Sequence, residues 1–365
     1  MSTNKVRVAK KNRRRRKHPS GPLYAAVDLG TNNCRLLVAK PQGTRFRVVD
    51  SYSQIARLGE GLHQTGRLSD ASMERAIDAL SAVRKKIKSK GVGQVRCIAT
   101  EACRRAENGA EFIRRIQSET GLSFKVITAK EEARLALISC FDLIDTSADR
   151  VLVVDIGGGS TELSLVNAKL AREAGFHASL TRAPILDWTS LPLGVVTLSE
   201  MFEHLGEEAA WPAMLNYARE TIEAWSGKTV TQSAMASAGA HIIGTSGTVT
   251  CLAGVHQNLD TYRRDKVDGS WLQRSEADQS ISRLRELDVE ARALLPTIGP
   301  GRAKLMLSGC AIIQACWDLF PAQRLRVADR GLREGLLLSM MYGPKRKRRR
   351  GGGRRPKAQT KQASS

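Results

Sequence analysis

Two acidic residues flank a run of three glycines near the middle of the chain. Asp155 and Glu162 lie seven positions apart within VLVVDIGGGSTELSLV, residues 151–166. The apolar runs on either side predict two β-strands, which places the glycines at the tip of a hairpin. Backbone N–H groups at such a tip can bind an oxyanion, and carboxylates beside a bound phosphate suit a hard divalent cation. The alternative is an ordinary glycine turn with solvated acids.

An earlier segment repeats this pattern. Residues 24–39 read YAAVDLGTNNCRLLVA, again a predicted strand, an aspartate, a small polar turn and a second strand. A displacement of 127 positions aligns Asp28 with Asp155 and Gly30 with Gly157 without a gap. Such an internal echo indicates two related halves, each contributing a phosphate-binding hairpin to a shared cleft.

A third glycine-rich turn has the same chemistry. Residues 244–248 read GTSGT and follow a short apolar run. This turn makes Gly244, Ser246 and Gly247 candidates for phosphate binding. Three unrelated turns remain the alternative, because short motifs alone give false positives.

Two neighbouring glutamates in the segment TAKEEARLA, residues 128–136, call for separate explanations. Thr128 followed three positions later by Glu131 predicts a capping box at the start of a helix. Glu132 lies about 100° further round that helix and therefore projects from a different face. Capping does not explain Glu132, so we interpret it as the residue free for chemistry.

The elements expected around these residues alternate between strand and helix. Apolar alternation predicts strands at residues 45–52, 95–99 and 124–127. An amphipathic pattern predicts a helix over 69–90, and leucines and methionines predict a terminal helix over 331–341. With 365 residues and a hydrophobic content of 42%, the chain is expected to form an α/β protein of two domains, over residues 23–148 and 149–343.

The net charge of +22 is concentrated at the two ends of the chain. Residues 1–20 hold nine lysines and arginines, and residues 344–365 hold ten, with no acid in either stretch. The rest of the chain carries about +3. We expect basic disordered tails over 1–22 and 344–365. They are either an electrostatic arm for polyphosphate, RNA or DNA, or simply solubilising segments.

Composition also predicts the compartment. Seven cysteines without CxxC spacing favour reduced thiols in a cytoplasm. No apolar stretch reaches the length of a membrane span, and the basic N-terminus lacks the apolar core of a signal peptide. A soluble cytoplasmic protein is therefore expected.

Taken together, these segments resemble the exopolyphosphatase and guanosine pentaphosphate phosphohydrolase (Ppx/GppA) family. The matching blocks occur in order as DLGTNNCRLLVA, ATEACRRAENG, TAKEEARLA, VVDIGGGSTEL, LPLGVVTL, GTSGT and DRGLREGLL. The resemblance implies two RNase H-like domains of the actin-like ATPase superfamily, with the active site in the cleft between them. It also implies a short form without the C-terminal helical domains of longer members, which favours short substrates.

The resemblance implies a role for each matching residue. Glu132 would act as general base on the attacking water. Asp155 and Glu162 would bind Mg²⁺ or another divalent cation, and Arg104 would contact the phosphate chain. Two loops would bind phosphate through Asp28, Gly30, Thr31 and Asn32 and through Gly157, Gly158, Gly159, Ser160 and Thr161.

The expected function is release of terminal orthophosphate from inorganic polyphosphate by metal-assisted attack of water. The alternatives are hydrolysis of pppGpp to ppGpp, a reaction of the stringent response, and a non-catalytic polyanion- or RNA-binding protein. An actin-like sugar kinase would share the glycine turns but would need an aspartate base. Candidate partners are polyphosphate or guanosine pentaphosphate as substrate, RNA or another polyanion at the tails, and a second copy of the chain in a homodimer. No membrane partner is expected.

Overall fold

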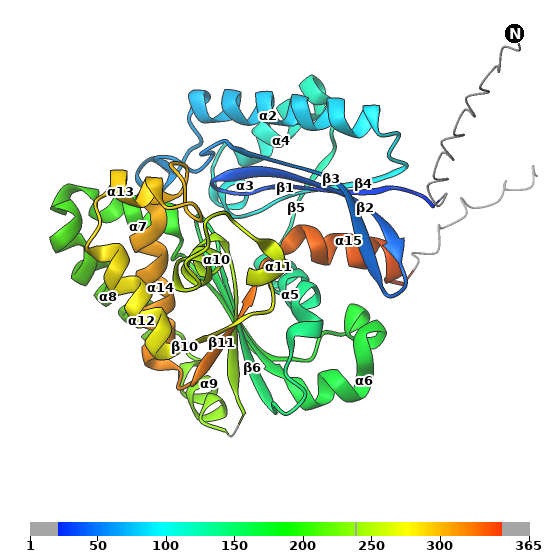
Figure 1. Cartoon of the computed structure of the whole chain (residues 1–365). Helices are drawn as coiled ribbons and strands as arrows, with labels where there is room; N and C mark the ends of the chain where they lie inside the picture. Colours follow the sequence, from blue (N-terminus) through cyan, green and yellow to red (C-terminus); the bar gives the residue numbers. More distant parts are fainter. Residues whose placement is uncertain (1–20, 238, 345–365) are drawn as a thin grey trace, which may run out of the picture.

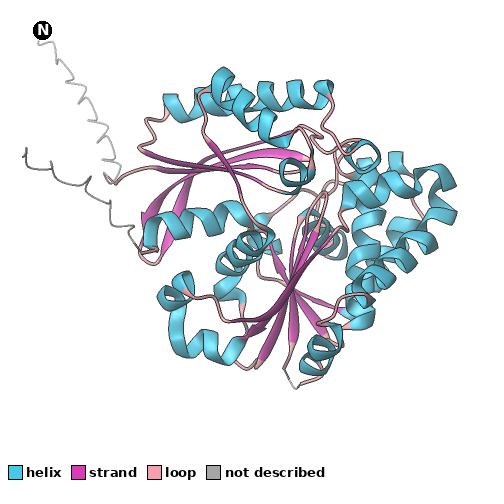
Figure 2. Cartoon of the chain, turned by 180° about the vertical axis from the view of Figure 1, so that it is seen from behind, coloured by secondary structure: helices cyan, strands magenta, loops and turns pink. Residues whose placement is uncertain are grey.

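The computed structural model describes residues 21–237 and 239–344, and most of each predicted basic tail lies outside these ranges. The described chain forms two mixed β-sheets, each with helices on both faces (Figures 1 and 2). This confirms the expected fold class of two RNase H-like α/β halves.

The first sheet contains five strands in the order β3-β2-β1-β4-β5. Strands β1, β2 and β3 are antiparallel neighbours, whereas β1, β4 and β5 run parallel. The strands are β1 (Tyr24–Leu29), β2 (Asn33–Gln42), β3 (Arg45–Ile55), β4 (Gln94–Ala99) and β5 (Phe124–Val126).

The second sheet repeats this arrangement. Its strands follow the order β8-β7-β6-β9-β11, and β10 extends the edge beyond β11 as an antiparallel addition. The β6–β7 hairpin occupies the place that β1–β2 holds in the first sheet, which agrees with the internal echo in the sequence. The strands are β6 (Arg150–Ile156), β7 (Thr161–Asn167), β8 (Ile185–Leu191), β9 (His241–Thr245), β10 (Trp271–Gln273) and β11 (Arg324–Ala328).

Helices cover the first sheet on two sides (Figure 1). One face packs against α2 (Asp70–Ser89) and α4 (Gly109–Thr120), and the other against α15 (Leu332–Tyr342), which also contacts α5 (Ala129–Cys140). The predicted helix over 69–90 is confirmed as α2, whose stripe Ile77, Leu80, Val83 and Ile87 is buried. The short helices of this half are α1 (Leu62–Thr65) and α3 (Glu101–Arg105).

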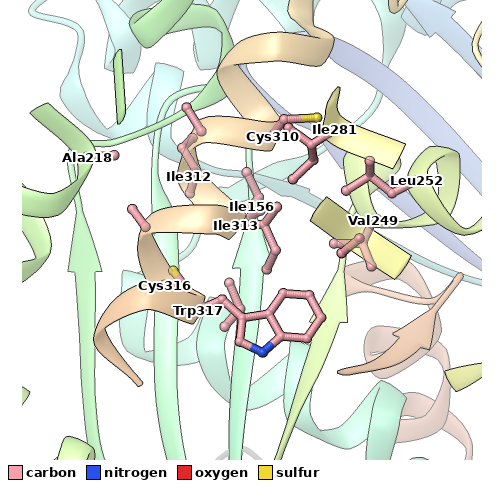
Figure 3. Packing of buried hydrophobic residues seen from close by; sticks show 14 of the residues in the cluster. Ile156, Ala218, Val249, Leu252, Ile281, Cys310, Ile312, Ile313, Cys316 and Trp317 are labelled. Carbon is pink, nitrogen blue, oxygen red and sulfur yellow. The ribbon is translucent and has the colours of Figure 1, made fainter. Parts of the chain in front are cut away.

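The second sheet has α5 and α6 (Ala168–Thr181) on the face towards the first half. A helical layer covers its other face, built around α14 (Met306–Leu319) (Figure 3). The remaining helices of this half are α7 (Val195–Phe202), α8 (Gly206–Glu223), α9 (Lys228–Met235), α10 (Gly247–His256), α11 (Arg264–Val267), α12 (Arg274–Arg285) and α13 (Val289–Leu294).

Alternation along β6 decides which side chains face the first half. Leu152, Val154 and Ile156 belong to the core around α14, and Figure 3 shows Ile156 beside the α14 side chains. Val151 and Val153 pack in the core that contains α5. Because successive side chains of a strand point to opposite faces, the next residue of that second series, Asp155, projects towards the α5 side.

The first sheet has the corresponding alternation. Val27 and Leu29 of β1 pack in the core beneath α2 and α4, whereas Ala26 packs with α15 on the opposite face. Asp28 therefore faces the α15 side. The aspartates of both hairpins consequently project into the space between the two halves.

The terminal helix follows the strands of the second sheet in the chain but packs on the first sheet. The sequence placed it in the second domain, which was predicted to extend to residue 343. In the structure Leu336 and Leu337 of α15 pack with Tyr24, Leu37 and Ile98 of the first sheet. The chain thus returns to the first half at its C-terminal helix, because the apolar face of α15 completes the core on that side. The division at residues 148 and 149 stays a prediction.

All seven cysteines are buried and form no disulfide. None of the helices in the described ranges combines the length and the apolar composition needed to span a bilayer.

Candidate active site

A cavity of about 330 Å³ lies between the two halves. Both glycine hairpins line it, together with the turn between β9 and α10 and the first residues of α15. Helix α10 and α15 both begin at the cavity, and Glu132 in the first turn of α5 lines it as well. Helix N-termini favour negative charge, so the surroundings of this cavity suit a phosphate group.

The two hairpin tips have the same backbone geometry. In the first loop, residues 30–33, the Gly30 N–H donates to the Asn33 carbonyl at 3.0 Å. In the second loop, residues 157–160, the Gly157 N–H donates to the Ser160 carbonyl at 2.8 Å. The two hydrogen bonds correspond under the displacement of 127 positions. The predicted relation between the halves therefore extends to the conformation of the turns.

Glycine is required where the two loops meet. A Cβ atom on Gly158 would lie 2.9 Å from the Thr31 Cβ, and one on Gly159 would lie 2.9 Å from the Thr31 Oγ1. Larger residues at these positions would push the halves apart. The glycines thus bring the second loop into van der Waals contact with the first at the cavity.

The carboxylates of Asp155 and Glu162 lie on adjacent strands, because these residues are directly opposite in the β6–β7 register. Burial raises the pKa of Asp155 well above its ordinary value, and the Glu162 charge raises it further. Burial also raises the pKa of Glu162, against the effect of hydroxyl donors. Ser160 and Ser190 both donate to Glu162 Oε1, at 2.8 and 2.7 Å.

Glu132 approaches the same carboxylates from α5. Thr128 caps this helix by accepting from the Glu131 N–H, and Glu132 follows in the first turn. Burial raises the pKa of Glu132 well above its ordinary value, and the charges of Glu162 and Asp155 raise it further, whereas Arg104 opposes this effect. Three acidic groups thus converge on one wall of the cavity.

Glu131 has a different partner from the one predicted. Its carboxylate forms a two-pronged ion pair with Arg134, with both N–O distances at 2.7 Å. The first half of the predicted capping box, from Thr128 to the Glu131 N–H, is present. The second half is replaced by this ion pair, since Arg134 lies one turn further along the same helix. Glu131 is therefore structural, as expected, but through Arg134.

The donor set fits Mg²⁺ with few protein ligands. Asp155 accepts no hydrogen bond from any residue of the described chain, and both donors to Glu162 use the same oxygen. Carboxylates crowded at raised pKa are stabilised by a bound cation, and Mg²⁺ commonly takes one or two of them and completes its shell with water and phosphate. In the described ranges, no three His, Cys, Asp or Glu side chains are placed so that together they could hold a metal ion. Asp155 and Glu162 are therefore the residues that would hold the ion.

Arg104 donates to several protein groups. Its guanidinium donates to Glu132 at 3.1 Å, to Glu101 at 2.6 Å and to the Ile127 carbonyl at 2.9 Å. It is not among the residues that line the cavity. The predicted contact of Arg104 with phosphate stays a prediction, whereas its contact with Glu132 is present.

Three other predicted phosphate contacts have protein partners in the structure. The Thr161 hydroxyl donates to the Leu193 carbonyl, and the Ser160 hydroxyl is engaged by Glu162. Gly244 lies within β9, where a Cβ atom would be 2.9 Å from the Val249 Cγ2. Its small size lets α10 pack on the strand. The predicted residues that line the cavity are Asp28, Gly30, Thr31, Asn32, Glu132, Asp155, Gly157, Gly158, Gly159, Ser160, Glu162, Ser246 and Gly247.

Sequence reasoning missed the arginines that line the cavity. Arg35, Arg302 and Arg333 all line it. Burial lowers the pKa of Arg35, and the charges of Arg333 and Arg302 lower it further, against the opposing effect of Asp28. No acceptor in the described ranges hydrogen-bonds the Arg35 guanidinium. An anion in the cavity would relieve this crowding of positive charge.

The internal echo contained the information needed to find Arg35. The displacement of 127 positions that aligns Asp28 with Asp155 also aligns Arg35 with Glu162. Both residues stand opposite the aspartate of their own hairpin. The first hairpin therefore carries a cation at the position where the second carries a carboxylate.

Comparisons with known proteins agree with this geometry. A guanosine-5'-triphosphate,3'-diphosphate pyrophosphatase from Photobacterium profundum is 29% identical over 331 residues, covering 89% of this chain. The chain spans 60% of the length of that relative. The crystal structure of an Aquifex aeolicus Ppx/GppA family member superposes with a TM-score of 0.68 at 28% identity, covering 87% of this chain and 97% of that one.

A more distant structure shows the fold alone. An exopolyphosphatase from Cytophaga hutchinsonii is 22% identical, with a TM-score of 0.76 over 88% of this chain and 99% of that one. The model of the Ppx/GppA phosphatase family matches residues 37–343, which include both carboxylate ligand candidates, Glu132 and the β9–α10 turn. The chain belongs to the Ppx/GppA phosphatase family.

Proposed function

We propose that this protein releases terminal orthophosphate from inorganic polyphosphate by attack of water on the last phosphoanhydride bond. The observation that carries the proposal is that one cavity brings together three carboxylates, Glu132, Asp155 and Glu162, and the guanidinium groups of Arg35 and Arg302. Phosphoryl transfer needs little covalent chemistry from the protein, so positioning and charge stabilisation provide most of the catalysis.

Glu132 is the residue suited to act on the water. It faces the cavity at the start of α5, and the hydrogen bond from Arg104 fixes its carboxylate. Its raised pKa brings the group closer to the pH at which a general base is effective. Glu132 would accept the proton of the attacking water as the oxygen–phosphorus bond forms, while the shortened polyphosphate leaves.

The loops and arginines would hold the substrate. Backbone N–H groups of the first and second loops would donate to phosphate oxygens in the cavity, and Arg35 would donate to the same chain from β2. A Mg²⁺ ion bound at Asp155 and Glu162 would supply charge neutralisation for the terminal phosphoryl group. Ser160 keeps Glu162 oriented through its hydroxyl hydrogen bond.

A second candidate is the 5'-phosphohydrolysis of pppGpp, which uses the same chemistry on a nucleotide. It is favoured by the name of the Photobacterium relative, a guanosine-5'-triphosphate,3'-diphosphate pyrophosphatase. Both substrates present a terminal phosphoanhydride to the same groups. A homodimer and a polyanion contact at the basic tails remain proposals that accompany either activity.

Phosphate release by the purified protein with Mg²⁺ tests the proposal. Long polyphosphate, tripolyphosphate and pppGpp are compared side by side, and ATP with and without sugars tests the kinase alternative. We expect phosphate release from polyphosphate with a kcat/KM at least equal to that for pppGpp. With ATP, we expect no reaction that depends on a sugar. Higher kcat/KM for pppGpp would favour the second candidate. No release from any of the three phosphoanhydrides, with tight binding of polyphosphate, would leave a non-catalytic polyanion-binding protein.

A further inference from the structure

Helix α7 contacts the second loop through its first turn. The Val195 N–H donates to the Gly157 carbonyl at 3.0 Å, and the Val196 N–H donates to the Gly158 carbonyl at 2.9 Å. These donors are among the N–H groups that a helix leaves without partners at its start. A Cβ atom on Gly194 would lie 2.3 Å from the Gly158 oxygen, so the helix can approach this closely because glycine precedes it.

The other half supports its own loop in a different way. Residues 56–61, between β3 and α1, form a segment that we call the support segment. The Ala56 and Arg57 N–H groups both donate to the Asn32 carbonyl at 2.9 Å, and the Gly59 N–H donates to the Thr31 carbonyl at 2.8 Å. These three hydrogen bonds fix the backbone of the first loop.

The same helix α7 reaches this support segment. Glu200, one turn beyond the residues that hold the second loop, accepts a hydrogen bond from the Gly61 N–H at 3.3 Å through Oε1. Its other oxygen, Oε2, is buried and has no partner in the described ranges. A buried polar atom without a partner is uncommon and costs free energy. Solvation by water therefore does not explain the position of the Glu200 carboxylate.

We propose that Glu200 is a positioning residue that sets the first loop against the second by joining the support segment to α7. The two loops belong to different sheets, and α7 contacts the carbonyl groups of one loop and the backbone that supports the other. Arg75 of α2 anchors the support segment within its own half, through the Ala56 and Arg57 carbonyls. Glu200 provides the corresponding anchor between the two halves.

Replacing Glu200 tests this role with two matched variants. Glu200→Ala removes the acceptor, whereas Glu200→Gln keeps an oxygen that can accept from Gly61. Glu203→Ala is the control, because Glu203 is exposed and pairs with Lys304 instead of with the support segment. All variants are made in the full chain, and their unfolding transitions are measured first.

Hydrogen exchange provides a readout that is independent of activity. Glu200→Ala should accelerate amide exchange in residues 56–62 and 30–33, whereas Glu200→Gln and Glu203→Ala should match the wild type. Unchanged exchange in Glu200→Ala would overturn the proposal. An equal increase in Glu200→Gln would overturn the acceptor role.

The kinetic readout rests on the proposed function. Glu200→Ala should raise the KM for tripolyphosphate about fivefold, the factor that an ordinary hydrogen bond is worth, with a smaller change in kcat. A lower unfolding temperature with unchanged KM would show a merely structural residue and would overturn the proposal. If the wild type releases no phosphate, the proposed function fails, and the exchange measurements alone decide the role of Glu200.

Discussion

Replacing Glu132 by glutamine separates catalysis from structure, because the amide oxygen can still accept from Arg104 while the base is lost. General-base loss lowers rates by about 10²- to 10⁴-fold, which corresponds to about 3–5 kcal/mol on the barrier. We therefore expect kcat for phosphate release from tripolyphosphate to fall by at least about 100-fold. The measurement is a steady-state phosphate assay with Mg²⁺ in excess.

The same substitution should not weaken the fold. Burial and the charges of Glu162 and Asp155 raise the pKa of Glu132 in the folded chain above its ordinary value of 4.5. A carboxyl with a raised folded-state pKa binds more protons folded than unfolded, so its contribution to stability decreases as pH rises through that window. Glu132→Gln should therefore match the wild type in acid and become the more stable protein as pH rises above 4.5, as measured by urea unfolding without Mg²⁺.

Glu131→Gln is the matched control one residue away. It disturbs the partly exposed ion pair with Arg134, which is worth about 1 kcal/mol or less, and it leaves the cavity unchanged. Its kcat should stay within about threefold of the wild type. If Glu131→Gln lost activity while Glu132→Gln kept it, the assignment of the two glutamates would be refuted.

Three further outcomes are expected. Arg104→Gln should move the acidic limb of the pH–rate profile to higher pH, because Arg104 lowers the pKa of Glu132 and the base must be ionised to act; a limb that stayed in place would contradict this. Asp155→Asn or Glu162→Gln should raise the Mg²⁺ concentration needed for half-maximal rate, and activity that persisted in excess EDTA would exclude the metal. A chain truncated to residues 21–343 should keep its kcat on tripolyphosphate. At low salt it should show a higher KM for long polyphosphate than the full chain, and this difference should fade as salt rises. Equal KM values at low salt would show that the tails do not collect polyanion.

The hairpins could be predicted because their causes are local. Continuous apolar runs and glycines specify strand, turn and strand within sixteen residues, and the echo at residues 24–39 needs no tertiary information. Glu132 could be separated from Glu131 by helical geometry alone. The error about the partner of Glu131 also has a local cause, since Arg134 competes for the carboxylate from the same helix.

The remaining features depend on contacts between distant segments. Arg104 meets Glu132 because β4, β5 and the starts of α3 and α5 lie side by side, which spacing along the chain does not reveal. The sequence predicts Gly244 in a phosphate-binding turn. In the structure, the close approach of the Val249 side chain leaves no room for a larger residue at this position. The place of α15 was not predictable, because an apolar helical pattern does not specify which sheet it covers.

The return of α15 to the first sheet has a consequence for how the protein acquires its structure during synthesis. Leu336 and Leu337 complete a core whose other members include Tyr24 and Leu37, near the opposite end of the chain. At ordinary translation rates, the ribosome would produce this helix on the order of tens of seconds after the β1–β2 hairpin. The first sheet would spend that interval with an incompletely covered apolar face, so nascent chains stalled before residue 332 should bind chaperones at this sheet, and the first half would reach its final stability last.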